Sequence, residues 1–219
     1  MASELIPGEV PVLRTCKPDG TSHGGFRWPL TVGAIVEAPD WNPKPTCGGG
    51  LHGLLRGEGN GSLLDWTEHA AWMVVAVAEV VDLVGKVKFP RCRVLHAGDR
   101  ASATSLLDRL APGAAIVGVS RIGGYRSTLT GGDYSTLTGG DYSTLTGGYR
   151  STLTGGYGST LTGGYRSTLT GGGGSTLSCQ WWAGNRMRIA VAYVGEDGIK
   201  PDVAYRVEDG KFVEVRDGE

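Results

Sequence analysis

The chain lacks the patterns that mark several common classes of protein. Its 21 basic and 22 acidic residues leave a formal net charge of −1, so no strong field favours nucleic acid or an anionic membrane as a partner. Its longest uninterrupted apolar stretch, Ala70 to Ala78, is too short to span a bilayer. The chain does not open on a basic stretch followed by an apolar run, so we predict a cytoplasmic location by default.

Cysteine is scarce, and the four residues of this type are scattered. Cys16, Cys47, Cys92 and Cys179 form no C-x-x-C pair, so the spacing indicates neither a disulfide framework nor a zinc site. We therefore expect reduced thiols, no bound metal and no cofactor.

Glycine, by contrast, is abundant, and much of it recurs with a strict period. Seven octads that begin at residues 123, 131, 139, 147, 155, 163 and 171 read as variants of Gly-Gly-x-x-Ser-Thr-Leu-Thr. Each joins a Gly-Gly pair to four residues that favour a strand. We expect the glycine pair to adopt positive φ and turn the chain, so that one octad forms one strand and one corner.

The octad predicts a β-solenoid with two flat sides. Because side chains alternate along a strand, the leucine and serine point inward together and both threonines point outward. Two octads then close one coil of 16 residues, although a three-sided coil of 24 residues remains an alternative. The predicted core consists of Leu129, Leu145, Leu161 and Leu177 on one sheet, and Leu137, Leu153 and Leu169 on the other.

Two sets of outward residues are candidates for contact with other surfaces. The threonines form regular Thr-x-Thr faces, which we predict to bind ordered water or ice. The tyrosines lie at the corners, where they either shield turn backbone or stack into an edge along which two solenoids could pair. The threonines are Thr128, Thr130, Thr136, Thr138, Thr144, Thr146, Thr152, Thr154, Thr160, Thr162, Thr168 and Thr170; the tyrosines are Tyr125, Tyr134, Tyr142, Tyr149, Tyr157 and Tyr165.

An open β-edge invites aggregation unless something covers it, so the solenoid requires a cap. Residues 179–219 read as antiparallel strands joined by turns that contain Asp-Gly, and we expect them to form this cap. Trp181 and Trp182 are expected to cover the last leucine layer.

The octad at 155–162 and the segment from Ser175 to Val215 resemble the repeats and the closing segment of bacterial ice nucleation proteins. The resemblance covers residues 123–219. It implies a solenoid of 16-residue coils and an activity in ordering water. Those proteins carry an outer-membrane anchoring domain and many tens of repeats, whereas seven octads make 3.5 coils, so we expect weak activity at most.

Residues 1–118 lack this periodicity and are expected to form a small α+β domain. Strands are predicted at 31–39, 70–81 and 91–98, and short helices at 62–70 and 103–111. The segment TCGGGLHGLL at 46–55 resembles a stretch in an uncharacterised small domain that precedes such repeats in other bacterial and phage proteins. The segment at 97–104 also reads as a worn octad.

The N-terminal region offers only weak candidates for an enzyme site. Cys47 and His52 suggest a thiol–imidazole pair or metal ligands, and Gly48 to Gly50 suggest a cradle for a phosphate or a nicotinamide cofactor, as in an ADP-ribosyltransferase-like domain. Asp99 and Asp108 suggest a carboxylate pair, but a helix start capped by Ser102 or Thr104 explains that segment equally well. We predict no catalytic residue.

The sequence thus predicts a mainly β protein in three parts. These are a small α+β domain at 1–118, a two-sided solenoid at 119–178 and a β-hairpin-type cap at 179–219. The predicted function is that of a non-enzymatic structural repeat protein. A self-assembly module that carries the N-terminal domain is the first alternative, with a second copy of the chain as partner. A displayed N-terminal enzyme is the second.

Overall fold

The computed structural model describes residues 4–215. The chain divides into two compact units, Met1–Val117 and Gly118–Glu219, and each is described by itself. No helix within the described residues is both long enough and apolar enough to cross a membrane.

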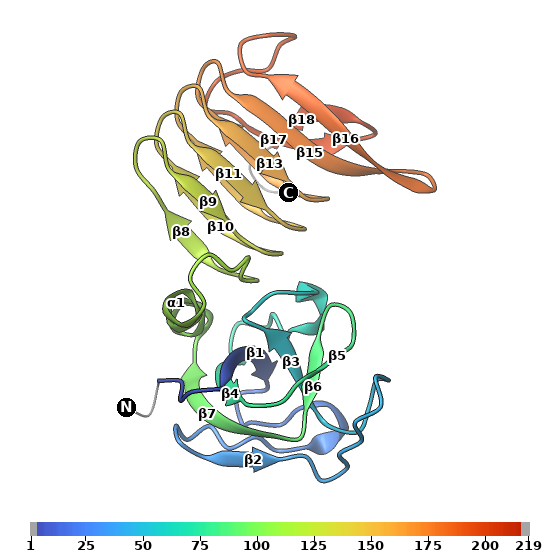
Figure 1. Ribbon diagram of the computed structural model, residues 1–219. Helices are drawn as coiled ribbons and strands as arrows, with labels where there is room; N and C mark the ends of the chain where they lie inside the picture. The colour runs from blue at the N-terminus through green and yellow to red at the C-terminus, as the bar shows by residue number, and fades with distance from the viewer. Residues whose placement is uncertain (1–3, 216–219) are drawn as a thin grey trace. The chain divides into compact units, whose positions relative to one another are not determined.

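The first unit is built on one antiparallel sheet of seven strands, in the order β2-β7-β4-β1-β3-β6-β5 (Figure 1). All seven residues of the central strand β4 are buried, which its continuous apolar sequence explains. The strands are β1 (Val10–Cys16), β2 (Ile35–Glu37), β3 (Leu51–Leu55), β4 (Ala71–Val77), β5 (Val81–Asp82), β6 (Val87–Phe89) and β7 (Arg91–Gly98).

One α-helix, α1 (Arg100–Leu110), packs on this sheet through the buried side chains of Ala103, Leu106 and Leu107. Asp99 caps it, because its Oδ1 atom accepts a hydrogen bond from the Ser102 backbone N–H at 2.8 Å. The expected helix over 103–111 is therefore present and begins earlier, while Ser102 and Thr104 are not its caps. The segment at 97–104, which reads as a degenerate octad, does not form a coil of the solenoid, because most of it belongs to this helix.

The helix predicted at 62–70 is absent. In this region only a short 3₁₀ helix forms, at Gly61–Leu63. A second 3₁₀ helix lies elsewhere in the chain, at His23–Gly25. The Asp65 carboxylate accepts hydrogen bonds from the backbone and the hydroxyl group of Thr67, a turn that competes with helical hydrogen bonding. The strand predicted at 31–39 is likewise reduced to β2, whereas the one at 91–98 coincides with β7.

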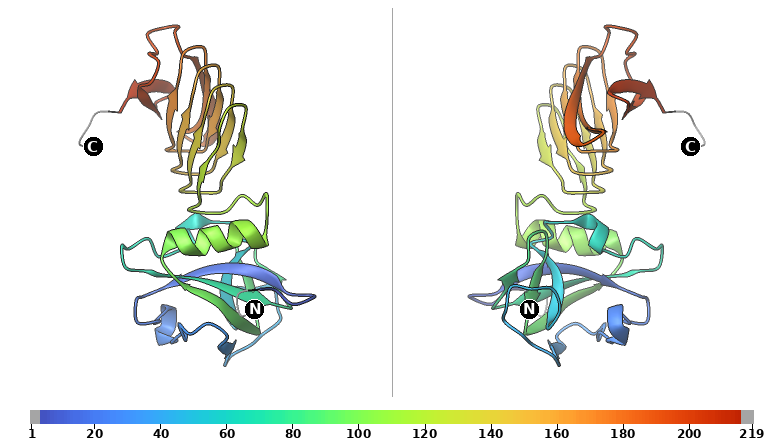
Figure 2. Two further views of the ribbon diagram at one scale, coloured as in Figure 1. Left: turned by 90° about the vertical axis from the view of Figure 1, so that its left-hand side faces the viewer. Right: turned by 90° about the vertical axis from the view of Figure 1, so that its right-hand side faces the viewer.

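The second unit is a β-solenoid whose strands form two parallel sheets that face each other (Figure 2). Strands β8, β10, β12 and β14 lie in one sheet, and β9, β11, β13 and β15 lie in the other. The strands are β8 (Ser120–Ile122), β9 (Thr128–Thr130), β10 (Thr136–Gly139), β11 (Thr144–Gly147), β12 (Thr152–Gly155), β13 (Thr160–Gly163), β14 (Thr168–Gly171) and β15 (Thr176–Ala183).

In the parallel strands of the solenoid, each residue pairs with the residue 16 positions later. Leu137 pairs with Leu153 in one sheet, and Leu145 pairs with Leu161 in the other. This register confirms the two-sided coil and excludes the 24-residue coil. The predicted leucine rows are correct, and six of the seven side chains, all except Leu129 at the first coil, are 0% exposed.

The serines form a second buried row. The Oγ atom of Ser151 lies 3.0 Å from that of Ser135 and donates to the Gly132 carbonyl oxygen at 3.1 Å. The Ser151 backbone N–H donates to the Oγ atom of Ser167 at 3.1 Å. Each hydroxyl thus links successive coils, which removes the cost of burying it.

The glycine pair serves a different purpose from the one predicted. Positive φ falls at the fourth octad position, as in Arg126, Tyr142 and Gly158, and not at the Gly-Gly pair. Glycine is required there because a Cβ atom would not fit. A Cβ atom at Gly147 would lie 2.7 Å from the Cβ atom of Ser151, and one at Gly164 would lie 2.6 Å from the carbonyl carbon of Gly148 in the coil before it.

The solenoid begins with a strand that the octad search missed. Strand β8 pairs with β10 in parallel, so Arg121 stands in the leucine row opposite Leu137. Gly118 has the positive φ of the fourth octad position. The Arg121 guanidinium group donates to the Thr130 carbonyl oxygen, so a polar side chain ends the apolar row.

Antiparallel strands close the other end, as predicted for the cap. Strand β16 (Arg186–Tyr193) pairs with β15, while β17 (Ala204–Glu208) pairs with β14 and with β18 (Lys211–Glu214). The buried side chains of Val194 and Tyr205 extend the leucine core.

The tryptophans do not close the core as expected. Trp181 and Trp182 are neighbours in one strand, so they point to opposite faces of the sheet. Trp182 is 51% exposed, and Trp181 packs at Gly210. Tyr205 and Val194, not the two tryptophans, lie in the cluster that contains Leu177.

The crowding at the glycines predicts unequal effects at equivalent positions. Gly164→Ala should lower the stability of the solenoid by about 1–3 kcal/mol, because its methyl group meets backbone of the preceding coil. Gly124→Ala, at the same octad position of the first coil, has no atom within 4 Å of the added methyl group and should change stability by less than about 0.5 kcal/mol. Urea unfolding followed by circular dichroism measures both. Equal losses would contradict the assigned close approach.

Candidate functional site

The outward threonines form a regular array on each sheet of the solenoid. They stand in register along the sheet, since Thr144 pairs with Thr160 and Thr146 with Thr162. Neighbouring strands are spaced by about 4.8 Å and the two threonines of one strand by about 6.6 Å. Each sheet therefore presents two rows of hydroxyl and methyl groups.

The two threonine faces differ in exposure. On the sheet that contains β11 and β13, Thr144, Thr146, Thr160 and Thr162 are all exposed. On the other sheet the first threonine of β10 and β12 is exposed, but Thr138, Thr154, Thr168 and Thr170 are partly buried. We call the first of these the open threonine face; its members are Thr128, Thr130, Thr144, Thr146, Thr160, Thr162 and Thr176.

A hollow of about 410 Å³ lies beside the open threonine face. Thr146, Thr162 and the corner residues Tyr149 and Tyr165 are among the residues that line it, so threonine and aromatic side chains meet there.

The six corner tyrosines form two continuous stacks. Tyr125, Tyr142 and Tyr157 follow one another with ring centroids 5.8 and 5.6 Å apart, both edge to face. The second stack consists of Tyr134, Tyr149 and Tyr165, at 5.5 and 6.1 Å.

The tyrosine stacks are continuous although their members come from two different positions of the octad. Tyr134 and Tyr142 occupy the fourth position, whereas the other four occupy the third. Where aspartate takes the third position, its carboxylate binds the next coil: the Oδ1 atom of Asp141 accepts from the Tyr157 backbone N–H at 2.8 Å. Stacking of the corner tyrosines was one of the two alternatives that the sequence left open, and the structure shows it.

The cap adds an apolar strip that sequence analysis did not identify. On the outer face of β16, the side chains of Met187, Ile189, Val191 and Tyr193 are exposed, and Ile189 reaches 64%. Tyr193 pairs with Thr176 across the sheet, so this strip continues the open threonine face. Strand β16 is one of the two edge strands of its sheet.

Cys47 and His52, the candidate residues of the first unit, do not form a hydrogen-bonded pair. Cys47 is exposed, and the Lys86 ammonium group lies 3.1 Å from its sulfur atom, which lowers the pKa of the thiol. Burial lowers the pKa of His52. Both residues line one cavity, but no hydrogen bond joins them among the described interactions.

Cys92 and Cys179 are buried thiols, and the Asp99 carboxylate has a structural role. Burial raises the pKa of Cys92 to about 12 and that of Cys179 to about 11, so both stay protonated. Asp99 serves as a helix cap. Within residues 4–215, no three histidine, cysteine or acidic side chains are grouped closely enough to hold a metal ion.

Comparison with known proteins identifies relatives of part of this chain. An ice nucleation protein of Xanthomonas campestris pv. translucens is 49% identical over 103 residues, which make up 45% of this chain and 6% of that protein. One of Pseudomonas syringae is 41% identical over 100 residues, 44% of this chain and 8% of the relative. The protein InaU of Pantoea ananas is 38% identical over 103 residues, 45% and 10% respectively.

The chain is similar to bacterial ice nucleation proteins. It spans a tenth or less of the length of these relatives. Together with the observed coils, the similarity confirms the resemblance predicted from the octads and characterises the chain as a structural repeat protein. No family model and no solved structure matches it.

The contrast between inward serines and outward threonines can be tested at neighbouring positions. Ser143→Ala should cost about 1–3 kcal/mol, because it leaves the Ser127 hydroxyl group and the Gly124 carbonyl oxygen without this buried partner. Thr144→Ser, one residue later, should cost less than about 1 kcal/mol, since its side chain is exposed. Chemical unfolding of the two variants gives the comparison. A silent Ser143→Ala would rule out a structural role for the serine row.

Proposed function

We propose that the open threonine face orders water and binds ice, and that this is a non-catalytic function of a structural solenoid. The observation that carries the proposal is the in-register array of outward threonines, most of them exposed, on a parallel sheet. The similarity to ice nucleation proteins supports it.

The array favours ordered water over a flexible ligand. Its rows repeat with the spacing of the coils. The backbone beneath them is held by pairing with a neighbouring strand on each side. Hydroxyl groups at fixed positions hold water at fixed positions, while the methyl groups between them contribute apolar contact. A surface that is already ordered loses little entropy when it binds an ordered lattice.

Size limits the activity of a single chain. Four threonine-bearing strands, β9, β11, β13 and β15, form the open face, so it is only about 14 Å long across the strands. A patch of this size holds a few rows of water but is far smaller than a surface that templates a crystal. We therefore propose weak shaping of ice crystals by the monomer, without efficient nucleation.

The exposed apolar strip on β16 favours a second candidate function, self-assembly. Natural edge strands usually carry charges or irregularities that prevent pairing with another chain. Strand β16 carries Arg186 and Arg188, but its outward positions are the apolar Met187, Ile189, Val191 and Tyr193. Antiparallel pairing of this strand with that of a second copy would join two open threonine faces, and sedimentation at increasing concentration would reveal the dimer.

The ice hypothesis predicts that charge on the open threonine face abolishes activity. The double variant Thr144→Lys/Thr160→Lys should lose thermal hysteresis and crystal faceting, because two ammonium groups disrupt one row of the array. Glu196→Lys introduces the same side chain in an exposed turn and should act like the parent. Ice-crystal microscopy at matched concentrations decides the matter. Faceting that persists in the double variant would overturn the assignment of this face.

A further inference from the structure

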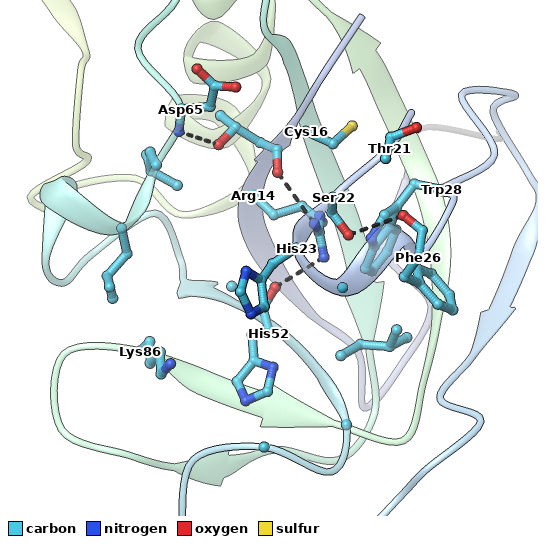
Figure 3. A pocket seen from close by; sticks show the side chains of 18 of the residues that line it. Arg14, Cys16, Thr21, Ser22, His23, Phe26, Trp28, His52, Asp65 and Lys86 are labelled. Carbon is cyan, nitrogen blue, oxygen red and sulfur yellow. Dashed lines mark hydrogen bonds between the residues drawn. The ribbon is translucent and has the colours of Figure 1, made fainter. Parts of the chain in front are cut away.

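An exposed thiol of the first unit lies beside a lysine, and the proposed function uses neither side chain. The Sγ atom of Cys47 is 3.1 Å from the Nζ atom of Lys86. Cys47 is exposed, whereas the other three cysteines are buried. Both residues also line a cavity of about 1350 Å³, and Figure 3 shows Lys86 among the lining residues. A small solute can therefore reach this pair.

A buried lysine holds the backbone on both sides of Cys47. Lys88 is 0% exposed, and its Nζ atom donates to the Thr46 carbonyl oxygen at 2.9 Å and to the Gly48 carbonyl oxygen at 3.1 Å. Thr46 and Gly48 are the two residues that flank Cys47 in the sequence. The thiol is therefore presented from an anchored segment of its loop.

The backbone of Lys86 is fixed by the hairpin of β5 and β6. These strands pair in antiparallel, and the Leu83 backbone N–H donates to the Lys86 carbonyl oxygen at 2.9 Å. The two residues between them, Val84 and Gly85, both have positive φ, as a tight hairpin turn requires. Among the described residues, no ion pair joins Lys86 to a carboxylate. Its ammonium group is therefore available to the Cys47 sulfur atom.

The two lysines favour the thiolate form of Cys47. The hydrogen bond and the charge of Lys86 lower the pKa of the thiol, and the charge of Lys88 acts in the same direction. The thiolate is the form that attacks electrophiles and that peroxides oxidise. Burial raises the pKa of each of the other three cysteines. Cys47 is therefore the thiol of this chain that is placed to react.

We propose that a hydroperoxide converts this pair into a covalent bridge, a sulfenamide bond between the Sγ atom of Cys47 and the Nζ atom of Lys86. The bridge ties the loop at 46–50 to the hairpin of β5 and β6. It also removes one positive charge from the lining of the cavity.

In the first step the thiolate attacks one oxygen atom of the hydroperoxide. An S–O bond forms and the O–O bond breaks, so the sulfur atom is oxidised by two electrons to a sulfenic acid while the peroxide is reduced. The Lys86 ammonium group gives a proton to the leaving oxygen, which departs as water or as an alcohol. A neutral amine then lies beside the sulfenic acid.

In the second step this amine attacks the sulfur atom. An S–N bond forms, the S–O bond breaks, and the hydroxyl group leaves as water with one hydrogen of the amine. The step needs no further oxidant. The observed separation of 3.1 Å between Nζ and Sγ lies within the range of about 3–3.5 Å that a reacting pair requires. Lys86 thus supplies first a proton and then the nucleophile.

Peptide mass mapping of the full chain tests the bridge. The protein is treated with hydrogen peroxide at neutral pH, digested, and compared with an untreated sample. The expected product is a linked pair of peptides that contain Cys47 and Lys86. Its mass should be that of the two peptides less two hydrogen atoms, and a thiol reductant should separate it. Oxidation of Cys47 to a sulfinic acid without any linked peptide would overturn the proposal, as would an unreacted thiol.

Matched variants locate the amine and the thiol. Lys86→Arg keeps a positive charge beside Cys47, but a guanidinium group stays protonated at neutral pH and does not attack sulfur. The bridge should therefore be lost, and Cys47 should proceed to the sulfinic acid. Lys44→Arg makes the same change at an exposed lysine of the same loop and should form the bridge as the parent does.

The remaining outcomes test the assignment of the pair. Cys47→Ser should give no linked peptide, because the other thiols are buried. A linked peptide in that variant, or one of unchanged yield in Lys86→Arg, would show that other side chains react and would overturn the proposal.

Discussion

The solenoid depends on the stacking of identical side chains from one coil to the next at the spacing of paired strands. Leucine lies on leucine and serine on serine, with each serine hydroxyl group bonded to the neighbouring coil. This interior is so thin that a single methyl group at Gly147 or Gly164 would collide with serine or backbone. The thin interior therefore selects the residues at four positions of the octad: the two glycines, the serine and the leucine.

The surface follows from that interior. Once leucine and serine face inward, alternation places both threonines outward and in register, and the corner positions fall into stacks of tyrosine. The same stacking leaves each end of the solenoid open. Arg121 ends the leucine row at the first coil, and the antiparallel strands with Val194 and Tyr205 close the last one. The apolar outer face of β16 is the part of this closure that stays exposed.

The sequence allowed the coil to be predicted because its signal repeats seven times. A leucine flanked by threonines predicts which side chains face inward. The eight-residue period allows a coil of two or of three octads, and the strand pairing shows two. The sequence did not reveal why the glycines are needed, since positive φ and close approach select the same residue. By contrast, alternation along the strand, counted from the inward Leu177, already indicated that Trp181 faces inward and Trp182 outward, so the expectation that both cover the core was wrong.

The first unit was harder to predict for a physical reason. Cys47 and Lys86 lie far apart in the sequence and belong to no common motif, so only the fold brings their side chains together. The helix expected at 62–70 had a plausible apolar pattern, but the side-chain hydrogen bonds of Asp65 favour a turn. Strand β7 and helix α1 were predictable, because each combines a strong local pattern with burial of one face.

The 16-residue register is the central claim, and cysteine cross-linking tests it most directly. Thr144 and Thr160 are paired on neighbouring strands about 4.8 Å apart, within the range that a disulfide spans. In a Cys47→Ser background, which removes the exposed native thiol, Thr144→Cys/Thr160→Cys should cross-link within one chain on mild oxidation. Thr136→Cys/Thr160→Cys, 24 residues apart and on opposite sheets, should not. Cross-linking of the second pair, and not of the first, would contradict the account.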